Sequence, residues 1–144
     1  MRILAVDWGE RRIGLAISDP LGVLATGLPT RSVSGQSDAL KAVAAVAAEQ
    51  EAERIVVGLP LLLSGERGAA ADAAQAFANA LGRRTGLPVE TWDERLTSAL
   101  GARRLREVGV RTGHAKGEVD RAAAVALLES WLMRRAAGRG TPGA

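Results

Sequence analysis

The chain has no cysteine, which excludes disulfide bonds and thiolate metal sites and fits a reducing compartment. It also has no apolar run long enough to span a bilayer. The first residues, Met1 to Asp7, lead directly into a patterned segment and lack the apolar region and cleavage site of a secretory signal. From these absences we expect a cytoplasmic protein.

Lysine is scarce, because only Lys41 and Lys116 occur among the 19 basic residues. The net charge of +3 favours a polyanionic partner such as nucleic acid. However, a charge carried almost entirely by arginine, in a chain rich in alanine and glycine, can equally reflect genomic base composition. Composition alone therefore leaves a nucleic-acid binder and other classes about equally open.

A chain of 144 residues is the size of one ordinary domain, which we expect at 1–136, with a disordered tail at 137–144. Short turns separate apolar strands at 2–7, 12–18 and 23–33, and this pattern predicts an antiparallel meander. The other predicted elements are a helix at 36–52 with Ser34 or Ser37 as N-cap, a strand at 54–60, a helix at 69–84, a strand at 89–92, a helix at 97–108, a glycine-rich basic loop at 109–118 and a helix at 119–136. This order implies an α/β fold, in which helices flank a five-stranded mixed sheet.

Asp7 ends the first strand and is followed by Trp8 and Gly9. An acidic residue at the end of a buried strand is costly unless it is paired or holds a metal ion. The alternative is a carboxylate that caps the turn or pairs with Arg11 or Arg12. The short Asp-x-Gly pattern does not decide between these interpretations.

Asp93 and Glu94 leave the end of the fifth strand. Because side chains alternate along a strand, usually only one of the two faces a given site, and the other is available to pair with Arg95. Considered alone, the pair is better explained as an ordinary acidic helix start, with Thr97 or Ser98 as the cap.

Asp120 lies in the first turn of the last predicted helix, where the helix dipole favours an acid. The residues three, four and seven positions further along share its face of the helix, and they are Ala123, Ala124 and Leu127. Asp120 therefore projects from an apolar stripe that should pack on the sheet, and no partner is supplied locally.

These acidic residues all fall at the ends of elements that a mixed sheet brings together. In a chain with one histidine and no cysteine, carboxylates form a hard-oxygen site that suits Mg²⁺ or Mn²⁺ rather than zinc or copper. A pair of such ions can activate a water and stabilise the leaving oxygen of a phosphodiester. The combination therefore predicts a nuclease more specifically than any single residue does.

The chain also resembles the YqgF/RuvX family, in order, from about residue 2 to residue 133. The resemblance is carried by 7–19 (DWGERRIGLAISD), 56–60 with Gly65, 93–98 and 119–124. It implies the ribonuclease-H-like fold of Holliday-junction resolvases and a metal-dependent endonuclease. The family is described both as a resolvase and as a nuclease that matures the 5′ end of pre-16S ribosomal RNA.

The resemblance assigns metal binding to Asp7, to the Asp93/Glu94 pair and to Asp120. Glu94 is the expected metal ligand of the pair, although the resemblance leaves open which of the two binds, and all four residues are expected to take part in catalysis. The better-known resolvases carry an acid at the end of the fourth strand, where this chain has Gly58-Leu59-Pro60. The second carboxylate must then come from the fifth strand, at Asp93 or Glu94.

Further residues are candidates for contact with substrate, and each also has an ordinary structural explanation. Gly9 and Gly58 either let a phosphate backbone approach closely or serve a turn or packing. The arginines either contact phosphate or pair with a neighbouring acid. The loop at 109–118 either clamps substrate and donates a proton to the leaving oxygen, or is simply solvated, which is the commoner case for a loop histidine. The candidate substrate contacts are Gly9, Arg11, Arg95, Thr97, His114 and Lys116.

Two other classes of protein compete with a nuclease. Actin-like and sugar-kinase ATPases also use an Asp-Gly turn, but they need two such domains and this chain is too short. A non-catalytic nucleic-acid-binding module in transcription or ribosome assembly is disfavoured, because carboxylates repel phosphate unless a metal intervenes. The sequence leaves open whether the substrate is pre-ribosomal RNA or branched DNA, and whether the protein is a monomer or a homodimer.

Overall fold

The computed structural model describes the whole chain except residues 10, 63, 97–112 and 140–144, and it describes only the backbone at 113–116 and 139. The helix expected at 97–108 therefore lies outside the described residues. No helix in the described part is both long enough and apolar enough to cross a membrane.

The centre of the fold is a mixed five-stranded sheet with the order β3-β2-β1-β4-β5. β1 pairs antiparallel with β2, and β2 pairs antiparallel with β3, so the predicted meander is confirmed. β4 joins the other edge of β1 in parallel, and β5 joins β4 in parallel. The strands are Ile3–Asp7 (β1), Arg12–Ser18 (β2), Ala25–Ser32 (β3), Arg54–Leu59 (β4) and Val89–Asp93 (β5).

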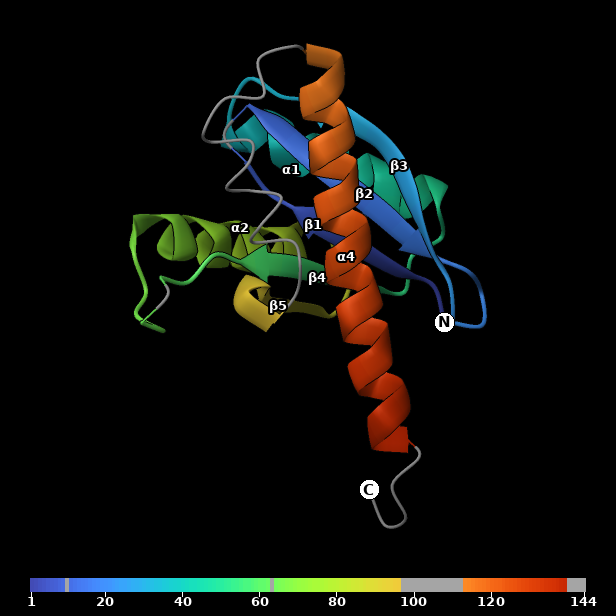
Figure 1. The fold of residues 1–144 in the computed structure, drawn as a ribbon. Coiled ribbons are helices and arrows are strands. Elements are labelled where there is room, and N and C mark those ends of the chain that lie inside the picture. Colours follow the sequence, from blue (N-terminus) through green and yellow to red (C-terminus); the bar gives the residue numbers. More distant parts are fainter. Residues whose placement is uncertain (10, 63, 97–112, 140–144) are drawn as a thin grey trace.

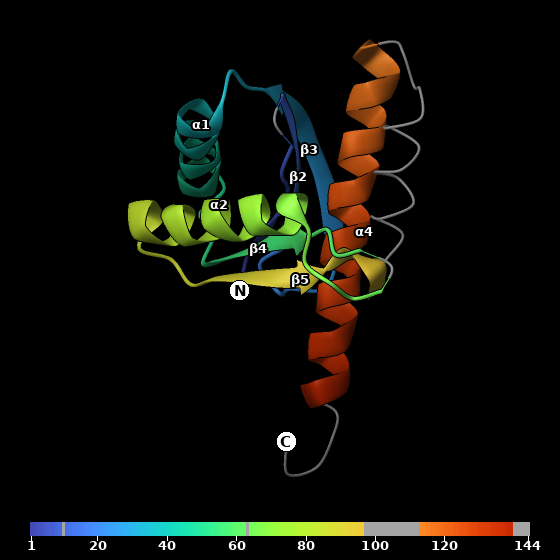
Figure 2. The ribbon, with the colours of Figure 1, turned by 90° about the vertical axis from the view of Figure 1, so that its left-hand side faces the viewer.

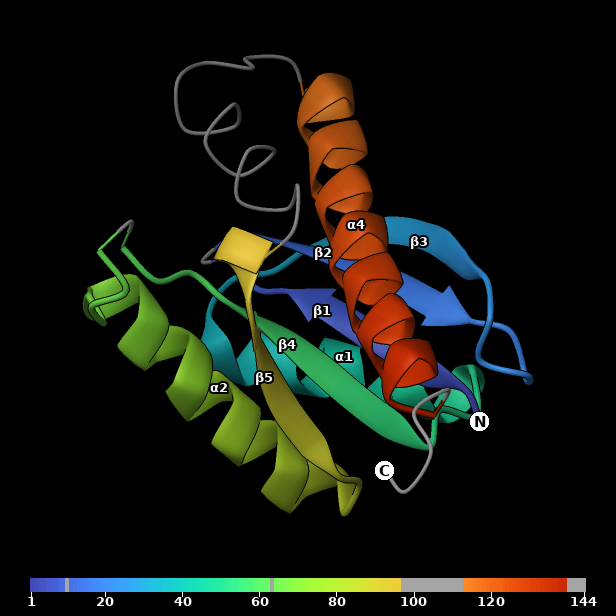
Figure 3. The same ribbon diagram turned by 60° about the horizontal axis from the view of Figure 1, so that its bottom comes forward.

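Helices cover both faces of this sheet, as the order of elements in the sequence predicts. Helices α1 (Gln36–Glu49) and α2 (Ala69–Thr85) lie on one face, and the long helix α4 (Gly113–Arg139) lies on the other. Figure 2 shows the two sides with the sheet between them. In Figures 1 and 3, α4 crosses β1, β2 and β3 and continues past the edge of the sheet.

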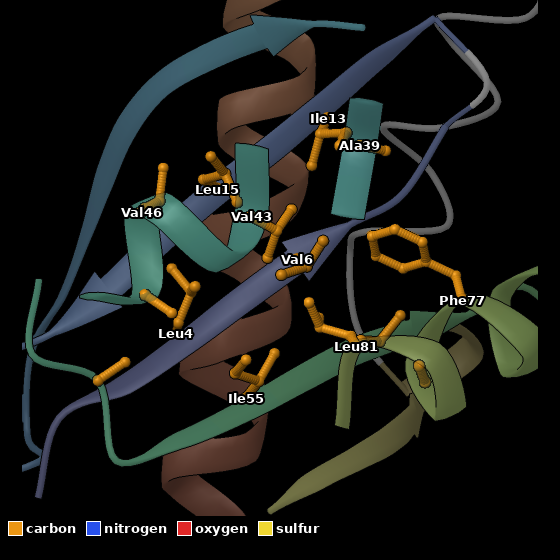
Figure 4. Close-up of a cluster of buried hydrophobic side chains, with 14 of the residues drawn as sticks. Leu4, Val6, Ile13, Leu15, Ala39, Val43, Val46, Ile55, Phe77 and Leu81 are labelled. Atoms are coloured by element: carbon orange, nitrogen blue, oxygen red, sulfur yellow. The ribbon is translucent and has the colours of Figure 1, made fainter. Parts of the chain in front are cut away.

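The alternation of side chains along β1 explains why both faces are covered. Leu4 and Val6 pack with Val43 and Phe77 in the core beneath α1 and α2 (Figure 4). Ile3 and Ala5 face the other way and pack against α4. Each large apolar side chain buried in this way contributes roughly 1.5–3 kcal/mol to folding, so β1 is held from both sides.

The last helix begins earlier than the sequence predicts. α4 starts at Gly113, so residues 113–118 are helical and are not part of a loop. Gly117 is a poor helix former, but its carbonyl accepts a hydrogen bond of 2.8 Å from the hydroxyl of Thr30 on β3. This tertiary contact supports the first turns of α4. Asp120 therefore lies well inside the helix, and the explanation of this acid by a first-turn dipole is wrong.

Three other local predictions need correction. β3 begins at Ala25 rather than at residue 23. Helix α1 has Gly35 as its N-cap, without a side-chain cap. Instead, the carboxylate of Asp38 accepts a hydrogen bond of 2.9 Å from the backbone N–H of Ser34, so neither expected serine caps the helix. α4 continues to Arg139, so the first residues of the expected disordered tail, 137–139, are helical, and 140–144 lie outside the described residues.

Candidate active site

Asp7 is the last residue of the central strand β1, and its side chain is only 1% exposed. It lies two residues after Ala5, which packs against α4, so alternation directs Asp7 to the same face of the sheet. On one side it pairs with Gly14 of β2. On the other side Val6 pairs with Val57 of β4, which brings Asp7 next to Gly58. The central carboxylate is thus flanked by glycines on both neighbouring strands.

Glu94 follows β5 directly, in a single turn of 3₁₀ helix, and it is fully buried. Its carboxylate extends back over the neighbouring strand β4. A Cβ atom placed on Gly58 would lie 2.4 Å from Glu94 Oε1, so the carboxylate occupies the space that a side chain at 58 would need. Glu94 therefore approaches Asp7 from the β4 side.

Asp120 approaches from the β2 side and is also fully buried. A Cβ atom on Gly14 would lie 2.1 Å from the backbone carbonyl oxygen of Asp120. Helix α4 consequently rests directly on β2 at the residue that pairs with Asp7. The Asp120 side chain accepts a hydrogen bond from Arg12, with 2.9 Å between Nε and Oδ2.

The two glycines therefore bring three carboxylates to one end of the sheet, on the face covered by α4. The backbone of Asp120 packs on Gly14, and the carboxylate of Glu94 packs on Gly58. Asp7 lies on the strand between these two glycines. Burial of so many carboxylates is unfavourable unless cations or hydrogen-bond donors compensate them.

Asp93 has a different environment from Glu94, although the two are adjacent in sequence. It pairs with Leu59, which packs with Ala71 of α2 on the opposite face of the sheet. Arg95 donates to its carboxylate, with 2.7 Å between Nη2 and Oδ2, and the Arg95 backbone N–H donates to Oδ1 at 2.9 Å. These hydrogen bonds hold the pKa of Asp93 below its usual value. The placement favours Glu94 over Asp93 as the member of the buried group.

The candidate substrate contacts differ in their exposure and in their partners. A Cβ on Gly9 would lie 2.8 Å from the carbonyl oxygen of Arg12, so the turn itself requires a glycine there. Arg11 is exposed beside this turn, and Arg95 is paired with Asp93. Thr97 lies outside the described residues. The backbones of His114 and Lys116 belong to the first turns of α4, and their side chains are outside the described residues.

Trp8, which follows Asp7, stacks on Phe77 of α2 with 5.6 Å between the ring centroids. Arg12 and Gly14 are site residues that sequence reasoning did not single out as functional. Both face α4 from the start of β2, and the period-two alternation from Ala16 was the signal that could have identified them.

The divalent cation that the sequence predicts would need oxygen ligands at this site. Three buried carboxylates provide the hard oxygen donors that Mg²⁺ and Mn²⁺ prefer, and the bare glycine at 58 leaves room for one of them. The donor set therefore fits. However, no group of three acidic or histidine side chains within the described residues already has the spacing to hold a metal ion. Asp120 is instead paired with Arg12.

The fold is similar to that of known resolvases. Thermus thermophilus RuvC, solved in complex with a Holliday junction substrate, matches with a TM-score of 0.58 at 17% identity, covering 94% of this chain and 96% of that one. The fowlpox virus resolvase, solved with Holliday junction DNA, matches with a TM-score of 0.55 at 12% identity, covering 94% and 99% of the two chains. The molecule is thus a ribonuclease-H-like α/β protein, with buried carboxylates at the end of its central strand.

Sequence comparison identifies the family within this class. A family model described as "RuvX: Holliday junction resolvase" matches residues 1–134. A relative from Koribacter versatilis is 45% identical over 141 residues, which cover 98% of this chain and 92% of the relative. One from Anaeromyxobacter dehalogenans is 44% identical over 136 residues, covering 94% and 99%. Both bear the name "Putative pre-16S rRNA nuclease". The chain belongs to the RuvX family, and the resemblance described above is confirmed.

Proposed function

We propose that the chain is a metal-dependent endonuclease that hydrolyses phosphodiester bonds in nucleic acid, with pre-16S ribosomal RNA as its first candidate substrate. The observation that carries this proposal is the burial of Asp7, Glu94 and Asp120 around one strand end. Such a cluster is unfavourable for binding a polyanion by itself. It becomes useful when a cation is held between the carboxylates and a phosphate.

Asp7, Glu94 and Asp120 are the residues that would hold Mg²⁺ or Mn²⁺. When bound, such an ion stabilises the charge that develops on a phosphoryl group and lowers the pKa of water. Asp7 provides the fixed central oxygen donor, because β1 is held from both faces of the sheet. Glu94 and Asp120 are brought to it by β5 and α4. Arg11, which is exposed beside the turn after Asp7, would contact a backbone phosphate.

The choice of substrate rests on the relatives. Proteins that are 44–45% identical and match almost the whole chain are named for pre-16S ribosomal RNA. A four-way DNA junction is the second candidate, because the matching family model is described as a Holliday junction resolvase. Cutting two symmetric strands of a junction together requires a homodimer, whereas trimming one RNA end requires only a monomer.

The experiment compares a precursor RNA fragment that contains the 5′ end of 16S RNA with a synthetic four-way DNA junction. Each substrate is incubated with the protein and with Mg²⁺, Mn²⁺ or a chelator. Asp7→Asn should abolish cleavage and leave the fold intact by circular dichroism. Asp72→Asn, which changes an exposed acid on α2, is the matched control and should cut like the parent.

Four outcomes separate the alternatives. Selective cutting of the RNA supports the first candidate, and selective cutting of the junction supports the second. If the Asp7→Asn protein cuts at the parent rate, the assignment of the active site is wrong. A protein that binds RNA without any metal, and does not cut with Mn²⁺, would be a non-catalytic binding module.

A further inference from the structure

The ion pair between Arg12 and Asp120 connects the start of β2 to the middle of α4. Nε of Arg12 lies 2.9 Å from Oδ2 of Asp120, and the Asp120 side chain is 0% exposed while that of Arg12 is 27% exposed. A buried carboxylate is unfavourable unless a cation or donor compensates it. Arg12 therefore contributes positive charge to one of the three carboxylates of the candidate site.

The same contact lies where a metal ion would have to bind. Asp7, Glu94 and Asp120 are all buried on the α4 face, yet no such group within the described residues is spaced as a ready three-ligand site. An arginine keeps its proton under all conditions relevant to proteins. A guanidinium and a divalent cation that approach one carboxylate must therefore repel each other, and burial strengthens this repulsion.

We infer that Arg12 is an exchangeable counter-cation, which holds Asp120 when no divalent ion is bound and competes with that ion for the Asp120 carboxylate. The inference deepens the proposed function and rests on it. Arg12 is suited to exchange, because its side chain is partly exposed and long enough to turn outward without leaving a cavity in the core. The backbone of Asp120 has no such freedom, because it is pressed against Gly14.

A fixed orienting role makes the opposite prediction. If Arg12 held Oδ2 permanently so that the other oxygen could bind metal, its removal would loosen Asp120 and weaken metal binding. If Arg12 competes with the ion, its removal strengthens metal binding. The sign of the change in affinity therefore separates the two roles.

The test measures binding of Mn²⁺ alone, without nucleic acid, by isothermal titration calorimetry on the full chain. Arg12→Gln should bind Mn²⁺ more tightly than the parent, on the order of tenfold, which is within the range for coupled binding events. It should also be less stable than the parent without metal and gain more in unfolding temperature when Mn²⁺ is added. These readouts do not depend on cleavage.

Arg31→Gln is the matched control. Arg31 pairs with Ile13 across β2 and β3, and Ile13 belongs to the core on the α1 and α2 face. The control removes the same charge at the same end of the sheet from the opposite face. Its Mn²⁺ affinity should stay within about twofold of the parent, because exposed charges are strongly screened. An equal gain in Mn²⁺ affinity in both variants would overturn the inference, because it would show that any loss of positive charge at this end of the sheet favours the ion.

An unchanged or weaker Mn²⁺ affinity in Arg12→Gln overturns the inference. If that variant does not fold without metal, Mn²⁺ should restore its circular dichroism spectrum, and failure to do so at any concentration also overturns it. Asp7→Asn separates this failure from failure of the proposed function. If Asp7→Asn loses Mn²⁺ binding but Arg12→Gln binds Mn²⁺ like the parent, only the role of Arg12 is wrong. If neither the parent nor Arg12→Gln binds Mn²⁺, both proposals are wrong.

Discussion

The carboxylate of Glu94 occupies the space above Gly58 that a side chain at that position would fill. Only 2.4 Å would separate Oε1 from a Cβ atom at residue 58. The fourth strand of this chain ends without an acid, and the glycine explains how the site accommodates that. Since residue 58 has no side chain, an acid from the next strand can reach across it toward Asp7.

Gly58→Ala should therefore impair cleavage more than stability. The new methyl group meets the end of a flexible side chain, so Glu94 can move aside at a cost of about 1–3 kcal/mol, as is typical of overpacking. The displaced carboxylate no longer lies beside Asp7, and an error of about 1 Å in a reacting group can cost roughly 100-fold in rate. Cleavage rates and urea unfolding of the same preparations measure the two effects. A variant that cuts like the parent would remove Glu94 from the site.

Gly14→Ala should reduce the stability of the fold directly. Its methyl group would lie 2.1 Å from the backbone carbonyl of Asp120, and a helix backbone cannot move aside alone. We expect a loss of about 1–3 kcal/mol in the free energy of unfolding, typical of overpacking. Gly138→Ala is the control, because nothing lies within 4 Å of a Cβ there, and alanine should stabilise that helical position by about 0.5–1 kcal/mol. Equal stability of the Gly14→Ala protein and the parent would contradict the close contact.

Much of this fold can be predicted from local patterns. Apolar runs bounded by turns identify the strands, and an acid at the end of such a run, Asp7, marks the centre of the candidate site. Asp120 could also be found, because its helical neighbours Ala123, Ala124 and Leu127 are apolar and prove to be buried. These signals operate within a few residues of each other, which is the range over which strand and helix periodicity is defined.

The rest depends on contacts between distant segments. The ion pair of Arg12 with Asp120 joins residues separated by 108 positions, and no local pattern specifies it. In the first turns of α4, the hydroxyl of Thr30 donates a hydrogen bond to the carbonyl of Gly117, and such a tertiary contact offsets the low helix propensity of glycine. The choice between Asp93 and Glu94 required the register of β5 on β4.

Asp93→Ala should slow cleavage even though Asp93 does not belong to the buried group. Its carboxylate accepts hydrogen bonds from the backbone N–H and the guanidinium of Arg95. The guanidinium also lies against Gly65 in the loop before α2. The pair thus fixes the turn that carries Glu94. We expect a fall in kcat on the order of tenfold with little change in KM, because the substitution removes an orienting contact but does not remove a contact with substrate.

The kinetic constants of Arg95→Gln distinguish this role from the direct phosphate contact also considered for Arg95. If Arg95 acts through Asp93, the two variants show the same loss in kcat. If Arg95 binds phosphate, Arg95→Gln raises KM while Asp93→Ala leaves the guanidinium free and does not. Parent values of kcat in both variants would show that the turn needs neither residue.

Asp19 should make stability depend on pH in the acid range. Its carboxylate accepts hydrogen bonds from the backbone N–H groups of Leu24 and Val23, at 2.8 and 2.7 Å, and these bonds hold the pKa of Asp19 below its ordinary value. A group whose pKa is lower in the folded state stabilises the fold above its unfolded pKa, about 4. That contribution is lost as the pH falls through the folded value.

Asp19→Asn keeps an oxygen acceptor but removes the charge, so the parent should be the more stable protein at pH 7. The difference in the free energy of unfolding should disappear once the pH is well below about 4, and urea titrations of both proteins across this range measure it. A difference that stays constant into strong acid would show that the Asp19 charge does not stabilise the turn between β2 and β3.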